Sequence, residues 1–358
     1  MWTDRRLLDL FGIEHPVIQA PMAGSTNPEL VAAVSTSGAL GSFGAASSPP
    51  DKLRTVVQAI QQRTSNPYNI NLFAASTEQF DRNARPGPGL AQHLQNYHDE
   101  LALGPVPEPG PLFGPAEAQL DVLLEQRVPV ISIHFGVDSA TVERAKSAGA
   151  KVLCSATTVA EARQLEAAGV DAIIAQGAEA GGHRGTFAGD YRQALIGTLA
   201  LVPQIVDEVS VPVIAAGGIM DARGLVACLA LGAAGVQMGT AFLGCPETPM
   251  PQAWRDALLQ ADGSATVVTE TLSGKPARGL RNRYIEEIEA LQEPLLPYPA
   301  QYSLSRELRK AAAERDDPRF MAMWAGQGVG LLRQQPAAEL VQNLVTESQA
   351  LLQRLGGR

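Results

Sequence analysis

Eight short apolar runs follow one another along the first two thirds of the chain, each followed by a segment with the periodicity of an amphipathic helix. The runs lack alternation of apolar and polar residues, which is typical of parallel strands buried on both faces. The segments between them, such as residues 139–150, begin near a capping Ser or Thr and end at Ala-Gly, as helices do. The runs are residues 16–22, 39–44, 68–73, 129–136, 151–156, 171–177, 212–218 and 235–243.

This repetition predicts an α/β fold, a TIM (β/α)8 barrel over residues 1–243, because open doubly wound sheets more often stop at five or six strands. Residues 80–114 are rich in Pro and Gly, so we expect an excursion with one short helix, free to border the barrel mouth. After residue 243 the strand rhythm stops and amphipathic helical patterns follow. Residues 244–358 are therefore predicted to form a mainly helical domain that caps or flanks the barrel.

Composition narrows the class of partner. The 358 residues include 28 basic and 37 acidic side chains, and a net charge of −9 argues against nucleic acid and for a small-molecule partner. No run of about 18 apolar residues occurs, so no membrane span is expected. Three cysteines in largely apolar surroundings argue against a disulfide framework and indicate a cytoplasmic protein. The oligomeric state stays open between monomer and homodimer.

Glycines follow the seventh and eighth runs, at the edge where barrel enzymes place their active sites. Backbone N–H groups of Gly217, Gly218, Gly239 and Thr240 are predicted to bind a phosphate near a helix N-terminus. The alternative is that the glycines only make tight turns from strand to helix. Two such loops on adjacent strands favour a phosphorylated cofactor.

Small residues and amides follow other runs. In "PMAG", Pro21 fixes a bend and Ala23 leaves room for a flat ligand, although an ordinary turn explains the motif equally well. The side-chain amides of Asn71 and Gln176 both donate and accept hydrogen bonds. The edge of an isoalloxazine ring requires such mixed partners.

Histidines provide the candidate acid–base chemistry. His183 lies in "QGAEAGGHRGTF", where glycines leave it unshielded, and imidazole titrates near neutral pH. The alternative is a loop histidine satisfied by the backbone. His134 alternates with apolar residues in "SIHFG", so core packing and an active-site role are both open. No second His or Cys pair has metal-ligand spacing, and a metal is not expected.

Tyr298, Tyr302 and Arg306 recur every four residues in a segment that Pro299 is predicted to open as a helix. On one helix face, two phenols and a guanidinium would bind a carboxylate or another anion above the cofactor. Aromatic packing beside a solvated Arg is the alternative. Residues 272–283 form a basic cluster that is either a phosphate contact or a solvated turn.

The chain resembles the class I nitronate monooxygenases, a flavin family, nearly from end to end. The resemblance implies a TIM barrel with FMN at its mouth and a helical domain. It also implies oxidation of alkyl nitronates such as propionate 3-nitronate by O2 through a flavin semiquinone, giving a carbonyl product plus nitrite or nitrate. Neutral nitroalkanes stay open as further substrates. The matching motifs are "QAPMAG", "NINLF", "SIHFG", "SATTVAEA", "GVDAIIAQGAEAGGHRGTF", "AAGGIMDARG", "GVQMGTAFL", "SGKPARGLRNR", "YPAQYSLSRELR" and "MWAGQG".

By position, the resemblance makes His183 the catalytic residue. It places His134, Tyr298, Tyr302 and Arg306 near the substrate, with Arg306 where the family has Lys. "PMAGST" departs from the family, whose members often have another Gly there. The residues implied to bind FMN are Ala20, Pro21, Met22, Ala23, Asn71, Gln176, Gly181, Gly182, Gly217, Gly218, Gln237, Met238, Gly239 and Thr240.

Two other functions share these loops. One is an FMN-dependent NAD(P)H oxidoreductase, acting as a quinone reductase or an enoyl-acyl-carrier-protein reductase, which rapid flavin reduction by NADH would indicate. The other is a barrel that binds a phosphorylated metabolite without catalysis, which a colourless protein unable to take up FMN would indicate.

Overall fold

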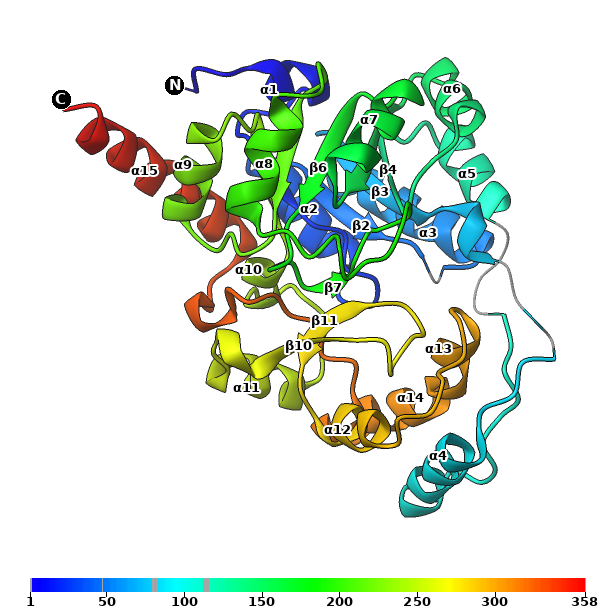
Figure 1. Ribbon diagram of the computed structural model, residues 1–358. Coiled ribbons are helices and arrows are strands. Elements are labelled where there is room, and N and C mark those ends of the chain that lie inside the picture. The colour runs from blue at the N-terminus through cyan, green and yellow to red at the C-terminus, as the bar shows by residue number, and fades with distance from the viewer. Residues whose placement is uncertain (1, 47, 79–80, 82, 112–115, 358) are drawn as a thin grey trace.

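The computed structural model describes residues 2–46, 48–78, 81, 83–111 and 116–357. Eight parallel strands stand in the order β1-β9-β8-β6-β5-β4-β3-β2, and a bridge between Ile18 and Leu40 joins the two ends of this order. The predicted TIM barrel is confirmed (Figure 1). Its strands are β1 Val17–Gln19, β2 Gly41–Gly44, β3 Tyr68–Phe73, β4 Val130–His134, β5 Lys151–Ala156, β6 Ala172–Gln176, β8 Val213–Ala216 and β9 Gly235–Met238.

Helices surround the strands, and several begin where a short polar side chain caps the first turn. Asn27, Asp138 and Thr158 each accept a hydrogen bond from a backbone N–H three residues ahead, which satisfies a donor that the helix itself leaves free. The helices of the barrel are α2 Pro28–Thr36, α3 Pro50–Gln61, α5 Ala116–Glu125, α6 Ser139–Ser147, α7 Val159–Ala167, α8 Thr198–Val206, α9 Ala222–Ala230 and α10 Thr240–Leu243.

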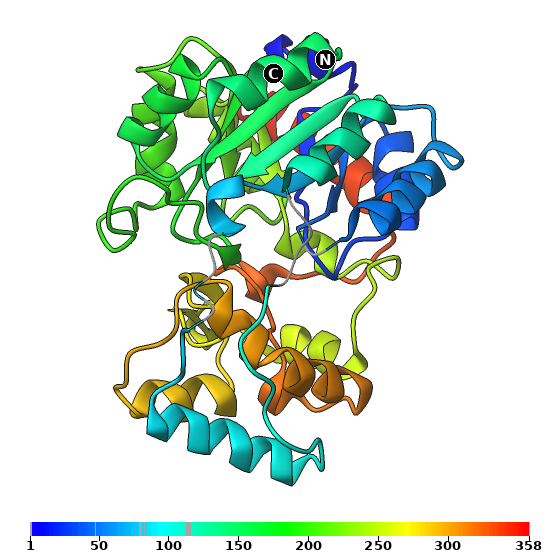
Figure 2. The ribbon, with the colours of Figure 1, turned by 90° about the vertical axis from the view of Figure 1, so that its right-hand side faces the viewer.

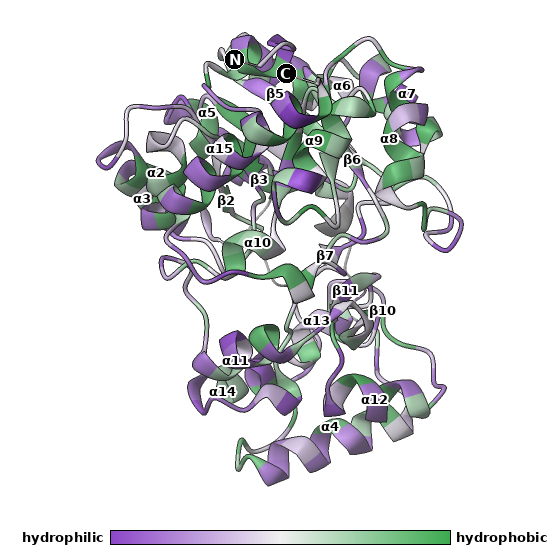
Figure 3. Cartoon of the chain, turned by 90° about the vertical axis from the view of Figure 1, so that its left-hand side faces the viewer, coloured by the Kyte–Doolittle hydropathy of each residue, from purple (hydrophilic) through white to green (hydrophobic). Residues whose placement is uncertain are grey.

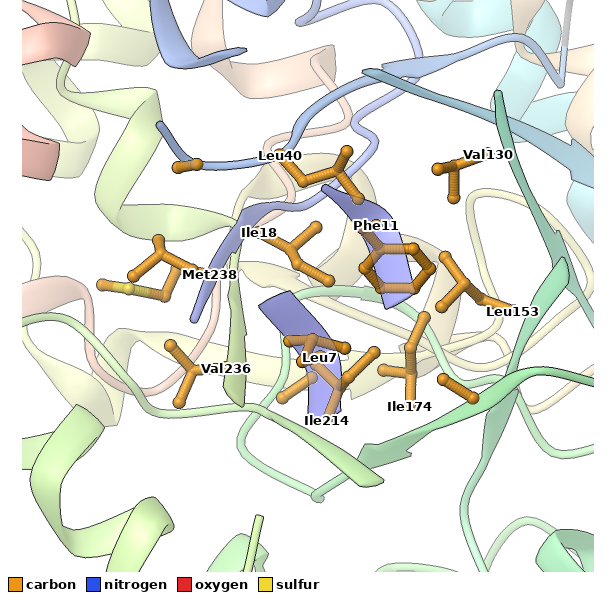
Figure 4. Close-up of a cluster of buried hydrophobic side chains, with 14 of the residues drawn as sticks. Leu7, Phe11, Ile18, Leu40, Val130, Leu153, Ile174, Ile214, Val236 and Met238 are labelled. Carbon is orange, nitrogen blue, oxygen red and sulfur yellow. The ribbon is translucent and has the colours of Figure 1, made fainter. Parts of the chain in front are cut away.

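Helix α1, Arg6–Phe11, closes the amino-terminal end of the barrel. Figure 4 shows Leu7 and Phe11 among strand side chains such as Ile18, Ile174 and Ile214. These residues are all at most 4% exposed. The apolar core therefore fills this end of the barrel and leaves the opposite end for a site.

A second core, which we call the cap, lies against the carboxyl ends of the strands (Figures 1 and 2). It contains the predicted helices and also a three-stranded sheet in the order β10-β11-β7, which the prediction of a mainly helical domain missed. The cap comprises α4 Pro88–Glu100, α11 Gln252–Gln260, β10 Thr266–Thr269, β11 Ala277–Leu280, α12 Arg283–Ala290, α13 Ala300–Leu304 and α14 Arg306–Glu314. Its third strand is β7, Gly182–His183, from the loop after β6. Elsewhere along the described chain, short 3-10 turns occupy Ala75–Glu78, Gly263–Ala265, Pro318–Phe320 and Val329–Leu331.

The predicted boundary at residue 243 needs two corrections. Helix α4 does not border the barrel mouth, because Leu90, Leu94 and Tyr97 are buried in the cap, on its side away from the barrel (Figure 2). Helix α15, Ala337–Leu355, belongs to the barrel, since its apolar face packs on α2 and α9. An amphipathic pattern predicts that one helix face is buried, but not which core buries it.

Figure 3 shows α4 and α12 with both hydrophilic and hydrophobic residues, as expected for helices with one buried face. The Tyr97 hydroxyl donates to Glu287 Oε2 at 2.8 Å, and Arg283 pairs with Glu100 at 2.7 Å. These contacts fasten the excursion to the cap. Among the described helices, none is long and apolar enough to cross a membrane.

Candidate active site

A cavity of about 1480 Å³, including the part open to solvent, lies between the strand ends of the barrel and the cap. Every residue predicted to bind a cofactor lines it, as do His134, His183, Tyr298 and Tyr302. Arg306 does not line it. The predicted cofactor-site residues in its wall are Ala20, Pro21, Met22, Ala23, Asn71, Gln176, Gly181, Gly182, Gly217, Gly218, Gln237, Met238, Gly239 and Thr240.

The sequence reasoning missed part of the wall. Trp324, Gly326 and Gly328 belong to "MWAGQG", whose glycines were a usable signal of a close backbone approach. The structure shows that approach, since a Cβ on Gly326 would lie 2.6 Å from the carbonyl oxygen of Glu179. Trp254 had no such signal, since it lies in an ordinary amphipathic helix. Also missed were Ser25, Gly44, Ala46, Phe73, Ser132, Ser155, Ile174, Ala180, Ala216, Ile219, Met220 and Leu243.

The loops after β8 and β9 contain four backbone N–H groups that are unpaired among the described residues, and we call these groups the anion cradle. Within the described chain, the backbone N–H groups of Gly217, Gly218, Gly239 and Thr240 donate no hydrogen bond to protein. Gly217 and Gly218 have φ values of 116° and 72°, which side chains other than hydrogen rarely tolerate. Unpaired N–H groups at such a loop are suited to a phosphate.

The first turn of the neighbouring helix α8 already has an acidic partner. Glu179 already caps its first turn, accepting hydrogen bonds from Thr198 N at 2.9 Å and from Thr198 Oγ1 at 2.8 Å. A carboxylate at this position satisfies the donors and the positive end of the helix dipole. The free donors are therefore those of the β8 and β9 loops.

Polar atoms elsewhere in the wall also lack partners. Gln237 Oε1 and Trp254 Nε1 are buried and make no hydrogen bond to any described residue. Asn71 donates through Nδ2 to the carbonyl oxygen of Ser132 at 3.2 Å, while its Oδ1 accepts nothing from the described chain. Buried polar atoms are costly unless they are paired. A flat ligand with donors and acceptors on its edge would pair them.

The loop after β6 is held more tightly than its glycines suggested. Gln176 donates through Nε2 to the His183 carbonyl oxygen at 2.9 Å and accepts through Oε1 from Gly185 N at 2.7 Å. The fully buried Arg184 donates to the carbonyl oxygens of Gly177 at 2.6 Å and Ala194 at 3.1 Å. The Gln176 amide thus binds the loop backbone, and the loop is a fixed part of the wall.

His183 reaches the cavity from β7, which pairs with β11 of the cap so that His183 stands opposite Ala277. Its Nε2 lies 3.0 Å from Ser273 Oγ, and its Nδ1 has no partner among the described residues. Rings surround the imidazole, with centroids 6.0 Å away for Phe73 and Tyr298 and 5.5 Å away for Trp324. An apolar enclosure of this kind strengthens electrostatic interactions.

Burial lowers the pKa of His183 to about 3, and the positive charges of Lys275 and Arg309, together with repulsion from His134 when that ring is protonated, add to this shift. Burial also lowers the pKa of His134 to about 4. Both rings are therefore neutral at pH 7. His134 lines the cavity, but both of its ring nitrogens already have partners, Ser155 Oγ and the His183 carbonyl oxygen, each at 3.2 Å.

Tyr298 and Tyr302 stack at the cavity, with centroids 6.3 Å apart. The predicted single helix is interrupted at Ser305, where α13 ends and α14 begins. Arg306 is exposed, so the prediction that it shares a helix face with the tyrosines is wrong. Nothing in the residue types signals the break, because neither Pro nor Gly stands there.

Arg309 occupies the position that Arg306 was predicted to take. Its guanidinium lies 3.7 Å from the centroid of the Tyr302 ring and donates to the Tyr302 carbonyl oxygen at 2.9 Å. No carboxylate of the described chain pairs with it. Arg309 does not line the cavity itself, but its cation has no counter-charge among the described residues and lies against Tyr302, which does line it, and it therefore favours anions near that ring.

Comparison with known proteins agrees with this architecture. A model of the nitronate monooxygenase family matches residues 4–347. A probable nitronate monooxygenase from Staphylococcus aureus strain MSSA476 is 41% identical, and the match covers 99% of both chains. The structure of nitroalkane oxidase from Streptomyces ansochromogenes is 37% identical, with a TM-score of 0.86 and coverage of 98% of this chain and 99% of that one. FabK from Thermotoga maritima is 30% identical, with a TM-score of 0.78 and 98% coverage of both.

Proposed function

The chain belongs to the nitronate monooxygenase family, and from that premise we propose that it binds FMN and uses O2 to oxidise alkyl nitronates. The observation that carries the proposal is one cavity that joins an unpaired anion cradle, unpaired polar atoms and a neutral histidine. Propionate 3-nitronate is the proposed test substrate. Its products would be the carbonyl compound and nitrite or nitrate.

The cavity wall fits FMN by its chemistry. The N–H groups of Gly217, Gly218, Gly239 and Thr240 would bind the phosphate. Asn71, Gln237 and Trp254 would bind polar atoms of the ring system, which would satisfy the buried Gln237 Oε1 and Trp254 Nε1. When bound, FMN would accept electrons from the nitronate and pass them to O2.

The chain's own residues would exclude water and handle protons. Phe73, Tyr298 and Trp324 enclose the space beside His183, which limits the competing reactions of a reactive carbanion-like substrate. A nitronate has already lost its α-proton and needs no base. A neutral nitroalkane must lose that proton first, and Nδ1 of His183, which has no partner among the described residues, would accept it.

The likeness to FabK supports a second candidate, an FMN-dependent NAD(P)H oxidoreductase that reduces quinones or enoyl-acyl-carrier-protein substrates. Both candidates use the same cofactor cradle. They differ in the electron donor, so the donor is what the experiment must vary.

The test is an anaerobic titration of the FMN-loaded protein, followed by its visible spectrum. Propionate 3-nitronate should bleach the flavin absorbance in part, by one electron, while NADH should change it slowly or not at all. Prompt two-electron bleaching by NADH with no response to the nitronate would replace the first candidate by the second.

A further inference from the structure

The contacts of Ser273 give the His183 ring a direction. Ser273 is 1% exposed and lies between β10 and β11 of the cap. Its hydroxyl donates to the Lys275 carbonyl oxygen at 2.9 Å, and it stands 3.0 Å from His183 Nε2. A hydroxyl has one hydrogen to donate. All these contacts are satisfied together only when His183 Nε2 carries the hydrogen and donates to Ser273 Oγ.

The second histidine of the cavity contrasts with the first. His134 Nε2 faces the His183 carbonyl oxygen, which only accepts, so this nitrogen carries the hydrogen. Its Nδ1 then accepts from Ser155 Oγ at 3.2 Å. Both nitrogens of His134 are occupied. Of the four ring nitrogens in these two cavity histidines, His183 Nδ1 alone has no partner among the described residues.

Two strands hold Ser273 and His183 in a fixed relation. Strand β11 pairs with β7, and Arg184 N donates to the Pro276 carbonyl oxygen at 2.8 Å. Next to Ser273, Gly274 has a φ of 77°, and a Cβ there would lie 2.3 Å from the Leu296 carbonyl oxygen. The backbone therefore passes closely against the segment before Tyr298, which leaves the serine little freedom.

We propose that Ser273 is a positioning residue that fixes the tautomer of His183 with Nδ1 as the proton acceptor of the active site. The inference rests on the proposed function. In the step concerned, the α-C–H bond of a neutral nitroalkane breaks, and its electron pair forms the C=N bond of the nitronate. The proton goes to Nδ1, and the imidazolium keeps its Nε2–H bond to Ser273. His134, Lys275, Arg309 and Tyr298 are the titratable or charged groups around the ring.

Nitrogen NMR of the FMN-loaded protein tests the tautomer without any substrate. Two-bond proton–nitrogen spectra of 15N-histidine protein distinguish protonated from unprotonated ring nitrogens, and His183→Asn assigns the signals. Wild type should show His183 protonated on Nε2 alone at pH 7. Ser273→Ala should give a mixture of tautomers, while Thr269→Val, which removes another buried hydroxyl of the same segment, should not. Protonation of Nδ1 in the wild type would overturn the inference even if no variant folds.

Kinetics provide the second readout. Ser273→Ala should lower kcat/KM for nitroethane about 10- to 100-fold and that for propionate 3-nitronate less than about threefold, because only the first reaction needs the base. Ser273→Thr should restore part of the loss. Equal losses for both substrates would indicate a merely structural serine and overturn the inference. A wild type that has the expected tautomer but oxidises neither substrate would refute the proposed function and leave the tautomer assignment standing.

Discussion

The barrel wall and the cap wall of the cavity differ in how the chain supplies them. On the barrel side, the contributing residues lie on a strand or in the segment that follows it, as Asn71, Met22 and Gly217 do. On the cap side, Trp254 and Trp324 come from segments with no common pattern, and so does Ser273, which does not line the cavity but contacts His183. The regular wall supplies the unpaired N–H groups of the β8 and β9 loops, and the irregular wall encloses His183. A repeating fold thus makes one half of a site predictable from the sequence, while the other half depends on tertiary packing.

The largest expected effect concerns the residue that both walls share. His183→Asn should lower kcat/KM for nitroethane about 100- to 10,000-fold, because the proton acceptor is lost. The loss with propionate 3-nitronate should be far smaller, and FMN should stay bound. Oxygen-electrode rates with the two substrates measure this, with His93→Asn on α4 as the control. Equal losses with both substrates would remove the base role from His183.

A cofactor cradle on the barrel wall predicts a specific loss of flavin. Gly217→Ala places a Cβ at a φ of 116°, 3.0 Å from Thr198 Oγ1, and should weaken FMN binding about tenfold or more. Gly189→Ala is matched, since its φ is 105° and it has no neighbour within 4 Å. Flavin fluorescence titration should separate the two variants. Similar FMN affinity in both would contradict the cradle.

In the cap, the two arginines of helix α14 should differ in their effect on substrate binding. Arg309→Gln should raise KM for propionate 3-nitronate about 3- to 10-fold, because an unpaired cation beside Tyr302 is lost. The exposed Arg306→Gln should change it less than about twofold. Propyl-1-nitronate, which lacks the carboxylate, is the comparison substrate and should respond less to Arg309→Gln. A larger effect at Arg306 would restore the original assignment.

The smallest expected effect is on how the free energy of unfolding changes with pH. Burial lowers the pKa of His183 to about 3 and that of His134 to about 4, against 6.5 for an unperturbed histidine. Between those values the unfolded chain binds more protons than the folded one, so stability falls as pH decreases from 6.5 towards 4. Each histidine should contribute up to roughly 1 kcal/mol per pH unit in this window. Urea unfolding at pH 7 and pH 5 should show that the free energy of unfolding depends less on pH in His183→Asn than in the wild type. The same dependence on pH in both proteins would contradict the burial of His183.

The sequence predicted the barrel well because its strands are buried on both faces and recur with helices between them. It also led to the expectation that the proposed cofactor-site residues meet at one edge, and they line one cavity. It failed where a contact depends on distant segments. The pairing of β7 with β11 joins residues about a hundred positions apart, and Ser273 stood in a basic cluster and a matched motif that gave it no role.

Helix continuity was the second limit. The spacing of Tyr298, Tyr302 and Arg306 favoured one helix face, but the break at Ser305 rotates the chain and brings Arg309 to Tyr302 instead. Likewise, the apolar face of α15 gave no sign that it packs on the barrel. Periodicity is local information, whereas the choice between two cores is not.

The central claim is that FMN in this cavity oxidises nitronates with O2. Initial rates of oxygen consumption by the FMN-loaded wild type, with propionate 3-nitronate and with NADH as alternative electron donors, test it most directly. The account predicts saturable oxygen uptake with the nitronate and a rate near background with NADH. Oxygen uptake driven by NADH, with none from the nitronate, would contradict it.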